Sequence, residues 1–141
     1  MEGRTFYLFT VVQMFVICAL LWFVFTIPGR RDLQRTMGQG LVAVGLSGIA
    51  VSRYHLGRSF SIRAEAHRLV THGIYSKIRN PIYVFGTLLF AGLVLVFHRP
   101  VLWLGVLAIA VMQTLRARRE ARVLEAAFGD AYRDYRRRTW F

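Results

Sequence analysis

The sequence predicts an all-α integral membrane protein, with about four transmembrane helices followed by amphipathic C-terminal helices on the cytoplasmic side. Hydrophobic residues make up 55% of the 141 residues, yet the formal net charge is +12. The apolar and the basic residues occupy separate stretches of the chain, which is typical of membrane proteins. The length suits one domain, so residues 1–141 are expected to form a single membrane domain.

The first predicted span is residues 6–27, which contain no charged side chain. A helix of this length crosses a hydrocarbon core of ~30 Å. A secretory signal peptide is the alternative for such a run, but no small-residue cleavage motif occurs around Pro28 and Gly29. We therefore expect a retained span that ends at this Pro-Gly pair.

The second predicted span is residues 37–52, a short run rich in glycine. Small residues let helices approach closely in lipid, so this run predicts an interior helix. Its glycines are Gly38, Gly40, Gly45 and Gly48. The alternative is a three-span protein in which residues 37–52 do not cross completely.

The third and fourth predicted spans are residues 82–97 and 101–115, separated by the three residues 98–100. So short a connection predicts a tight antiparallel hairpin. Each run is short for a span and suits a locally thin bilayer.

Charge predicts the orientation of the spans. Segments 53–81 and 116–141 hold most of the lysine and arginine, and the positive-inside rule makes them cytoplasmic. Four spans then place both termini in the cytoplasm, with the protein in the cell inner or plasma membrane. The arginines that follow the first span, Arg30, Arg31 and Arg35, fall on the opposite side and run against this rule.

The C-terminal segment, residues 116–141, is amphipathic and strongly basic. We expect Gly129 to end one helix and Asp130 to cap a second, short helix that carries Tyr132 and Tyr135 on one face. The arginines of this tail are expected to contact anionic lipid headgroups.

Two classes of function are disfavoured. A charge of +12 would suit a soluble nucleic-acid-binding domain, but four apolar runs make a soluble protein improbable. The chain has one cysteine, Cys18, so no intramolecular disulfide can form, and no spacing of Cys, His and carboxylate residues predicts a metal site.

A dense polar cluster in residues 72–83 directly precedes the third span. Polar groups at the edge of lipid need partners, which are either one another or a bound polar ligand. A hairpin of the last two spans would bring Asn80 and Tyr83 close to Arg116 and Glu120, forming a pocket of mixed charge.

Structural explanations exist for each of these residues alone. Asn80-Pro81 is a common way to start a helix. Tyr75 and Tyr83 suit the aromatic belt at a membrane interface. The pair Arg116 and Glu120 has the spacing of a surface ion pair on a helix.

The order of these motifs resembles the isoprenylcysteine carboxyl methyltransferase family, whose general pattern phospholipid methyltransferases share. The resemblance covers roughly residues 60–141. The residues that carry it are Arg79-Asn80-Pro81-Ile82-Tyr83-Val84-Phe85-Gly86, then Arg119-Glu120, Leu124, Phe128-Gly129, Tyr132 and Tyr135. The chain departs from the family pattern where Asn80 replaces a histidine and Arg119 replaces the first of two paired glutamates.

This resemblance implies methyl transfer from S-adenosylmethionine to a lipophilic acceptor in the membrane, with S-adenosylhomocysteine as product. The expected acceptor is a carboxylate on a prenyl-like molecule, and the alternatives are a phospholipid amine or a thiol. Arg116 would contact the acceptor. The residues implied to bind the cofactor are His67, Arg68, Leu69, Val70, Tyr75, Asn80, Pro81, Ile82, Tyr83 and Glu120.

Two other hypotheses remain open. Because Asn80 and Arg119 depart from the pattern, the chain could be a catalytically silent membrane scaffold that binds anionic lipid through its basic tail. Some sterol reductases use a similar pocket for a nicotinamide cofactor, but those proteins are much larger.

Overall fold

A computed structural model describes residues 3–56 and 69–141 of the chain, and these residues are helical almost throughout. They contain no β-strand, only one isolated bridge between Ile78 and Trp140. The all-helical prediction is therefore confirmed. The elements in chain order are α1 (Gly3–Thr26), α2 (Leu33–Leu56), the 3₁₀ turn η2 (Gly73–Ser76), α3 (Pro81–Phe97), the 3₁₀ turn η3 (Pro100–Leu102), α4 (Trp103–Phe128) and α5 (Asp130–Arg138).

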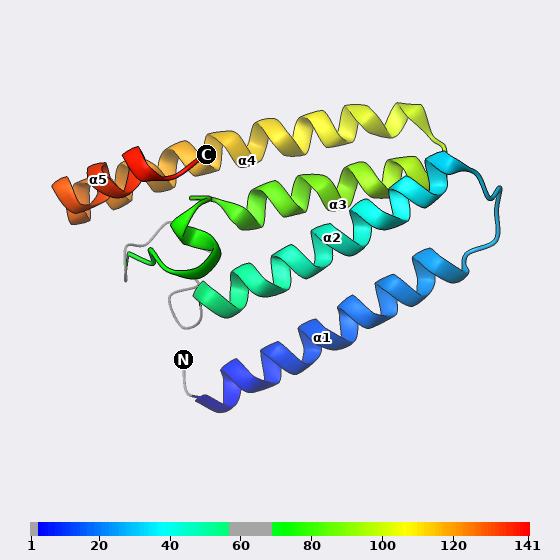
Figure 1. The fold of residues 1–141 in the computed structure, drawn as a ribbon, viewed down its shortest axis with the longest axis horizontal. Helices are drawn as coiled ribbons and strands as arrows, with labels where there is room; N and C mark the ends of the chain where they lie inside the picture. Colours follow the sequence, from blue (N-terminus) through cyan, green and yellow to red (C-terminus); the bar gives the residue numbers. More distant parts are fainter. Residues whose placement is uncertain (1–2, 57–68) are drawn as a thin grey trace.

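The four long helices lie side by side in chain order and alternate in direction (Figure 1). Helix α2 lies between α1 and α3, and α3 lies between α2 and α4. Short α5 folds back along the end of α4, next to η2 and the start of α3. The start of α1, the start of α3 and the end of α4 therefore all lie at this end of the bundle (Figure 1).

Glycines allow α2 and α3 to make the most extensive interface of the bundle. A Cβ atom on Gly45 would lie 2.8 Å from backbone atoms of Phe85 and Leu89, so only glycine fits there. Gly38 and Gly92 face each other in the same way. The prediction of a closely packed α2 is confirmed, and its helix is longer than the predicted residues 37–52.

Helix α1 joins the bundle through an apolar core and two side chains from α2. The core cluster includes Ile17 and Val24 of α1 together with residues of α2 and α3. Arg35 donates to the carbonyl of Ile27, and the Gln39 amide donates to the carbonyl of Val24 at 3.1 Å. These bonds satisfy carbonyls that the end of a helix leaves without partners.

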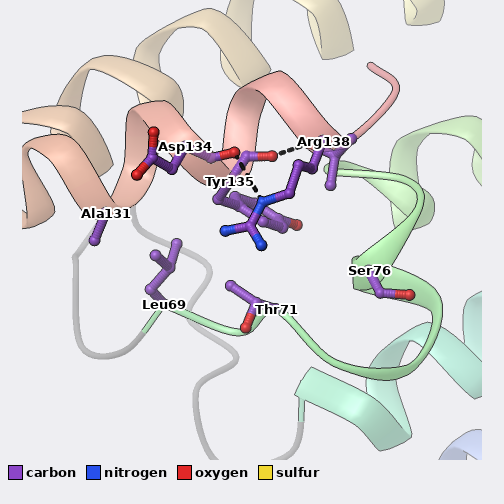
Figure 2. A pocket seen from close by; sticks show the side chains of 8 residues that line it. Leu69, Thr71, Ser76, Ala131, Asp134, Tyr135 and Arg138 are labelled. Carbon is purple, nitrogen blue, oxygen red and sulfur yellow. Dashed lines mark hydrogen bonds between the residues drawn. The ribbon is translucent and has the colours of Figure 1, made fainter.

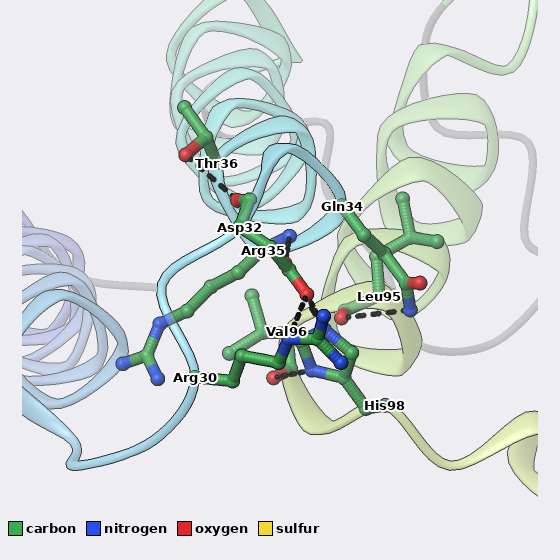
Figure 3. A network of polar contacts seen from close by, with 8 residues as sticks. All are labelled: Arg30, Asp32, Gln34, Arg35, Thr36, Leu95, Val96 and His98. Carbon is green, nitrogen blue, oxygen red and sulfur yellow. Dashed lines mark hydrogen bonds and ion pairs between the residues drawn. The ribbon is translucent and has the colours of Figure 1, made fainter.

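A polar clasp closes the end of the bundle opposite α5 (Figure 3). Asp32, before α2, lies 2.9 Å from Nε2 of His98, which caps α3 in a left-handed conformation. Asp32 also accepts the backbone N–H of Arg35 and pairs with Arg30. The clasp ties the α1–α2 turn to the α3–α4 turn, and it gives Arg30 and Arg35 a local structural role.

Among the described residues, one helical stretch, Pro100–Phe128, is long and apolar enough to cross a membrane. The stretches Thr10–Thr26 and Pro81–Phe97 are shorter apolar helices. Four spans are therefore not confirmed and stay a prediction. Large apolar side chains on α1 and α4 are exposed, as lipid-facing surfaces are; examples are Phe15, Trp22, Leu104 and Met112.

Two expectations about the C-terminal segment need correction. Helix α4 runs without a break through Arg116, because the change from apolar to charged side chains does not interrupt its backbone hydrogen bonds. Asp130 does not cap α5; it lies in the first turn, where it pairs with Arg133 at 3.3 Å. Gly129, with φ of +52°, ends α4 as expected, because glycine adopts this conformation readily.

Candidate functional site

The candidate site lies where α3 begins, between segment 69–80 and the C-terminal halves of α4 and α5. Pro81 occupies the first turn of α3, as predicted, and it is buried. Asn80 is the N-cap residue, but its side chain makes no capping hydrogen bond. Its backbone N–H donates to the carbonyl of Phe141 at 3.0 Å.

Tyr83, Arg116 and Glu120 meet in one hydrogen-bonded group between α3 and α4. The Tyr83 hydroxyl donates to Glu120 Oε1 at 2.6 Å, and Arg116 Nε donates to the same oxygen at 3.0 Å. The Glu120 carboxylate is only partly exposed. The hairpin predicted from the sequence does bring these three residues together, which the connectivity alone suggested.

A second polar contact lies one helical turn further along α3. The Thr87 hydroxyl is 2.9 Å from Gln113 Oε1 and 3.0 Å from the carbonyl of Tyr83. Gly86 is buried, and a Cβ there would lie 3.2 Å from the Gln113 amide nitrogen. The polar groups of the site therefore extend into the apolar part of the α3–α4 interface.

Two buried tyrosines join segment 69–80 to α5. The Tyr135 hydroxyl donates to the carbonyl of Tyr75 at 2.8 Å. Burial raises the pKa of Tyr75, and the nearby Tyr135 and Glu120 raise it further. Burial raises the pKa of Tyr135 to about 12, with a contribution from Tyr132. Both phenols are therefore neutral at physiological pH.

A pocket of about 460 Å³ lies between segment 69–76 and α5 (Figure 2). Leu69 and Thr71 face α5 across it, and the Arg138 side chain projects into the space between them. The wall mixes hydroxyls, an acid, a base and an apolar side chain. Its residues are Leu69, Thr71, Ser76, Ala131, Asp134, Tyr135, Arg138 and Thr139.

Residues 139–141 pair, through their backbone, with the residues just before α3. In this C-terminal strap, residues 139–141, the Trp140 N–H donates to the Lys77 carbonyl at 2.7 Å. The N–H groups of Arg79 and Asn80 donate to the carbonyls of Trp140 and Phe141, each at 3.0 Å. Sequence patterns missed this pairing because backbone groups form it and no side-chain signal marks it.

The structure brings some of the predicted site residues together. Tyr83, Glu120 and Arg116 are in contact, and Leu69 lines the pocket. Val70 and Tyr75 are buried in the same segment. The residues Asn80, Pro81 and Ile82 form the start of α3. His67 and Arg68 lie outside the described residues.

The structure also adds residues that sequence analysis missed. Thr87 and Gln113 had no recognised pattern, although a glutamine inside an apolar run is a signal, since polar groups are costly in lipid. Sequence spacing placed Tyr135 on one face of the short helix with Tyr132, but it did not predict the contact with the Tyr75 carbonyl. Within residues 3–56 and 69–141, no group of three or more His, Cys, Asp or Glu could hold a metal ion.

Comparison with known proteins gives one match. The family model described as phospholipid methyltransferase matches residues 33–131, from the first residue of α2 into α5. No curated protein and no solved structure matches the chain.

Proposed function

The chain belongs to the phospholipid methyltransferase family, the family that includes isoprenylcysteine carboxyl methyltransferases, and on this premise we propose a specific reaction and site. The reaction is transfer of a methyl group from S-adenosylmethionine to a lipophilic acceptor that partitions into the membrane. The observation that carries the proposal is the Glu120 carboxylate, which Tyr83 and Arg116 hold between α3 and α4.

The residues present fit this cofactor chemically. The Tyr83 hydroxyl and Arg116 Nε both donate to Glu120 Oε1, so the carboxylate retains acceptor capacity for an ammonium group or ribose hydroxyls. Leu69 supplies apolar surface in the pocket, Val70 is buried in the same segment, and the rings of Tyr75 and Tyr83 can accommodate a cation. His67, Arg68, Asn80, Pro81 and Ile82 complete the proposed cofactor-binding set.

S-adenosylmethionine, when bound, supplies a methyl group that its sulfonium has already activated for in-line displacement. The protein then has to hold donor and acceptor in line and exclude water. Segment 69–80 and α5 would hold the donor. Arg116 would orient the acceptor, since a guanidinium matches the geometry of carboxylates and phosphates.

The preferred acceptor is a carboxylate on a prenyl-like or other lipophilic molecule. A carboxylate needs no base, and the guanidinium of Arg116 would bind it. A phospholipid amine is the second candidate, and the description of the matching family model favours it. An amine has to lose a proton during methylation, as would the third candidate, a thiol, so either would need a base, for which His67 and His72 are the candidates.

The proposed setting is a cell inner or plasma membrane, with residues 1–141 as one domain and both termini cytoplasmic. The exposed arginines of α5 would contact anionic headgroups. Each basic residue near the membrane surface contributes about 1 kcal/mol to binding of the anionic leaflet. The cofactor would enter from the cytoplasm, and the acceptor would enter sideways from the bilayer.

Calorimetric binding of S-adenosylhomocysteine to the detergent-purified protein tests the cofactor site. We expect saturable binding that Glu120→Gln weakens about tenfold or more, because hydrogen bonds to a charged group are worth about 1.5–3 kcal/mol. Glu125→Gln is the matched control, since Glu125 lies on the same helix and its nearest ionic partner, Arg133, is outside the site. Binding in this variant should stay within about twofold.

Transfer of a labelled methyl group then distinguishes the acceptors. A farnesylated cysteine carboxylate and phosphatidylethanolamine are offered in parallel to the same preparation. Labelling of the first alone supports the carboxylate, and labelling of the second alone supports the amine. Absence of S-adenosylhomocysteine binding in folded protein would favour the silent scaffold instead.

A further inference from the structure

The C-terminal strap and α5 are attached to the rest of the bundle in an unusual way. The only covalent link of α5 to α4 is Gly129, whose φ of +52° makes a sharp turn. Everything else that holds α5 in place is non-covalent, and much of it is directed at segment 75–80. This segment carries Tyr75 and Asn80 and continues directly into Tyr83.

Four hydrogen bonds join α5 and the C-terminal strap to segment 75–80. Three are backbone bonds between the strap and Lys77, Arg79 and Asn80, with lengths of 2.7, 3.0 and 3.0 Å. The fourth is the bond of the Tyr135 hydroxyl to the Tyr75 carbonyl, which is buried on both sides. A buried carbonyl that loses its hydrogen-bond partner is costly, so this bond favours the closed arrangement.

The pocket lies inside this arrangement. Leu69, Thr71 and Ser76 form one wall, and residues of α5 and the strap form the other. If α5 and the strap moved away from segment 75–80, the second wall would leave with them. The pocket therefore exists as a two-sided site only while the pairing is closed (Figure 2).

We propose that the C-terminal strap and Tyr135 are positioning elements that couple closure of α5 over segment 75–80 to occupancy of the pocket. The inference rests on the proposed function, because it takes the pocket as part of the cofactor site. It goes beyond the family match, since Tyr135 and residues 139–141 lie outside the matched residues 33–131. By linkage, a ligand that binds the closed arrangement must in turn stabilise the strap.

A pair of substitutions at one position isolates the strap. Trp140→Pro removes the N–H that donates to Lys77, and Thr139 already has the extended conformation that precedes proline readily. Trp140→Ala is the matched control, because it keeps the backbone bonds and removes only a side chain that is 65% exposed.

Hydrogen exchange measures the strap directly. The amides of Arg79 and Asn80 should exchange about tenfold faster in Trp140→Pro than in Trp140→Ala. Saturating S-adenosylhomocysteine should slow their exchange in the wild type. Amides of α2 and α3 report whether each variant keeps the rest of the fold.

A second pair tests the side-chain bond without changing the backbone. Tyr135→Phe removes the hydroxyl bonded to Tyr75, and it should weaken S-adenosylhomocysteine binding about fivefold or more. Tyr132→Phe is the control, since Tyr132 is buried on the same helix and its hydroxyl has no hydrogen bond to segment 75–80 among the described residues. Binding by this control should stay within about twofold.

The outcomes separate the two proposals. Wild-type binding that Trp140→Pro and Tyr135→Phe leave unchanged would overturn the positioning role while the cofactor site stands. No binding by folded wild-type protein would overturn the proposed function and this inference with it. Weaker binding in both test variants, with both controls intact, supports the inference.

Discussion

Helix α3 has two neighbours, and its interfaces with them are built differently. Against α2 it makes a long interface in which glycines bring the two backbones together. Against α4 it makes a much smaller interface, and only Val106 and Ala117 of α4 are buried. The α3–α4 contact is tied by polar pairs, Tyr83–Glu120 and Thr87–Gln113.

The two interfaces suit different roles, one structural and one chemical. Packing between glycine-rich helices is rigid, because close backbone contact leaves no alternative arrangement. A loosely packed interface with polar groups can admit a ligand, and its side chains can replace their hydrogen bonds to one another with hydrogen bonds to that ligand. We interpret the α2–α3 pair as the support on which α3 presents its polar residues towards α4.

The largest expected effect is on the rigid interface. Gly45→Ala places a Cβ within 2.8 Å of backbone atoms that cannot move independently, so it should destabilise the fold by about 1–3 kcal/mol. Gly40→Ala is the same change on the same helix with no atom within 4 Å, and it should be neutral or stabilise by about 0.5–1 kcal/mol. Thermal unfolding in detergent measures both. Equal melting temperatures for the two variants would contradict the close packing.

An intermediate effect is expected on the polar interface. Thr87→Val and Gln113→Leu each remove one partner of the Thr87–Gln113 hydrogen bond and should destabilise by about 0.5–1.5 kcal/mol, and Thr87→Val also removes the contact of the hydroxyl with the Tyr83 carbonyl. A double-mutant cycle should show coupling of about 0.6 kcal/mol, the average for such bonds between membrane helices. Thr87→Ser keeps the hydroxyl and should restore most of the loss. Strictly additive single effects would show that the two side chains do not interact.

The smallest effect is expected at the clasp that closes the far end of the α2–α3 pair. The backbone N–H of Arg35 lowers the pKa of Asp32, and His98 and Arg30 lower it further. Since the folded pKa lies below the ordinary value of 3.8, the ionised carboxylate stabilises the fold above that pH. This contribution is lost as the pH falls through the lower, folded pKa.

Asp32→Asn tests the clasp through pH dependence. The melting temperature of the wild type should be level between about pH 7 and 5 and should fall in more acidic buffer. The variant should show a smaller fall over the same range, since its side chain does not titrate. Identical acid profiles for the two proteins would contradict the role of Asp32.

Local rules made several parts of this protein predictable. Proline in the first turn marks the start of α3, and Gly129 marks the end of α4. The three-residue connection between two apolar runs predicts a hairpin, and a hairpin brings Tyr83 to Glu120. Each of these follows from residues close in sequence or from one short connection.

Other parts depended on contacts that no local pattern encodes. Gly40 and Gly45 look alike in the sequence, but only Gly45 faces α3, and the rotation of the helix decides which. The continuity of α4 through Arg116 was not expected, because a change in polarity resembles a boundary although the backbone ignores it. The number of spans also stays a prediction, because length and composition identify only one candidate span among the described residues.

The sequence by itself determined the helical class, the segregation of apolar and basic residues, and the set of polar side chains before and after the final hairpin. These depend on composition, periodicity and the chemistry of single residues. Only the tertiary structure decided that Glu120 is shared by Tyr83 and Arg116, that Tyr135 binds the Tyr75 carbonyl, and that residues 139–141 return to pair with residues 77–80. Such contacts join residues far apart in the chain, and backbone groups, which are the same in every residue, make several of them.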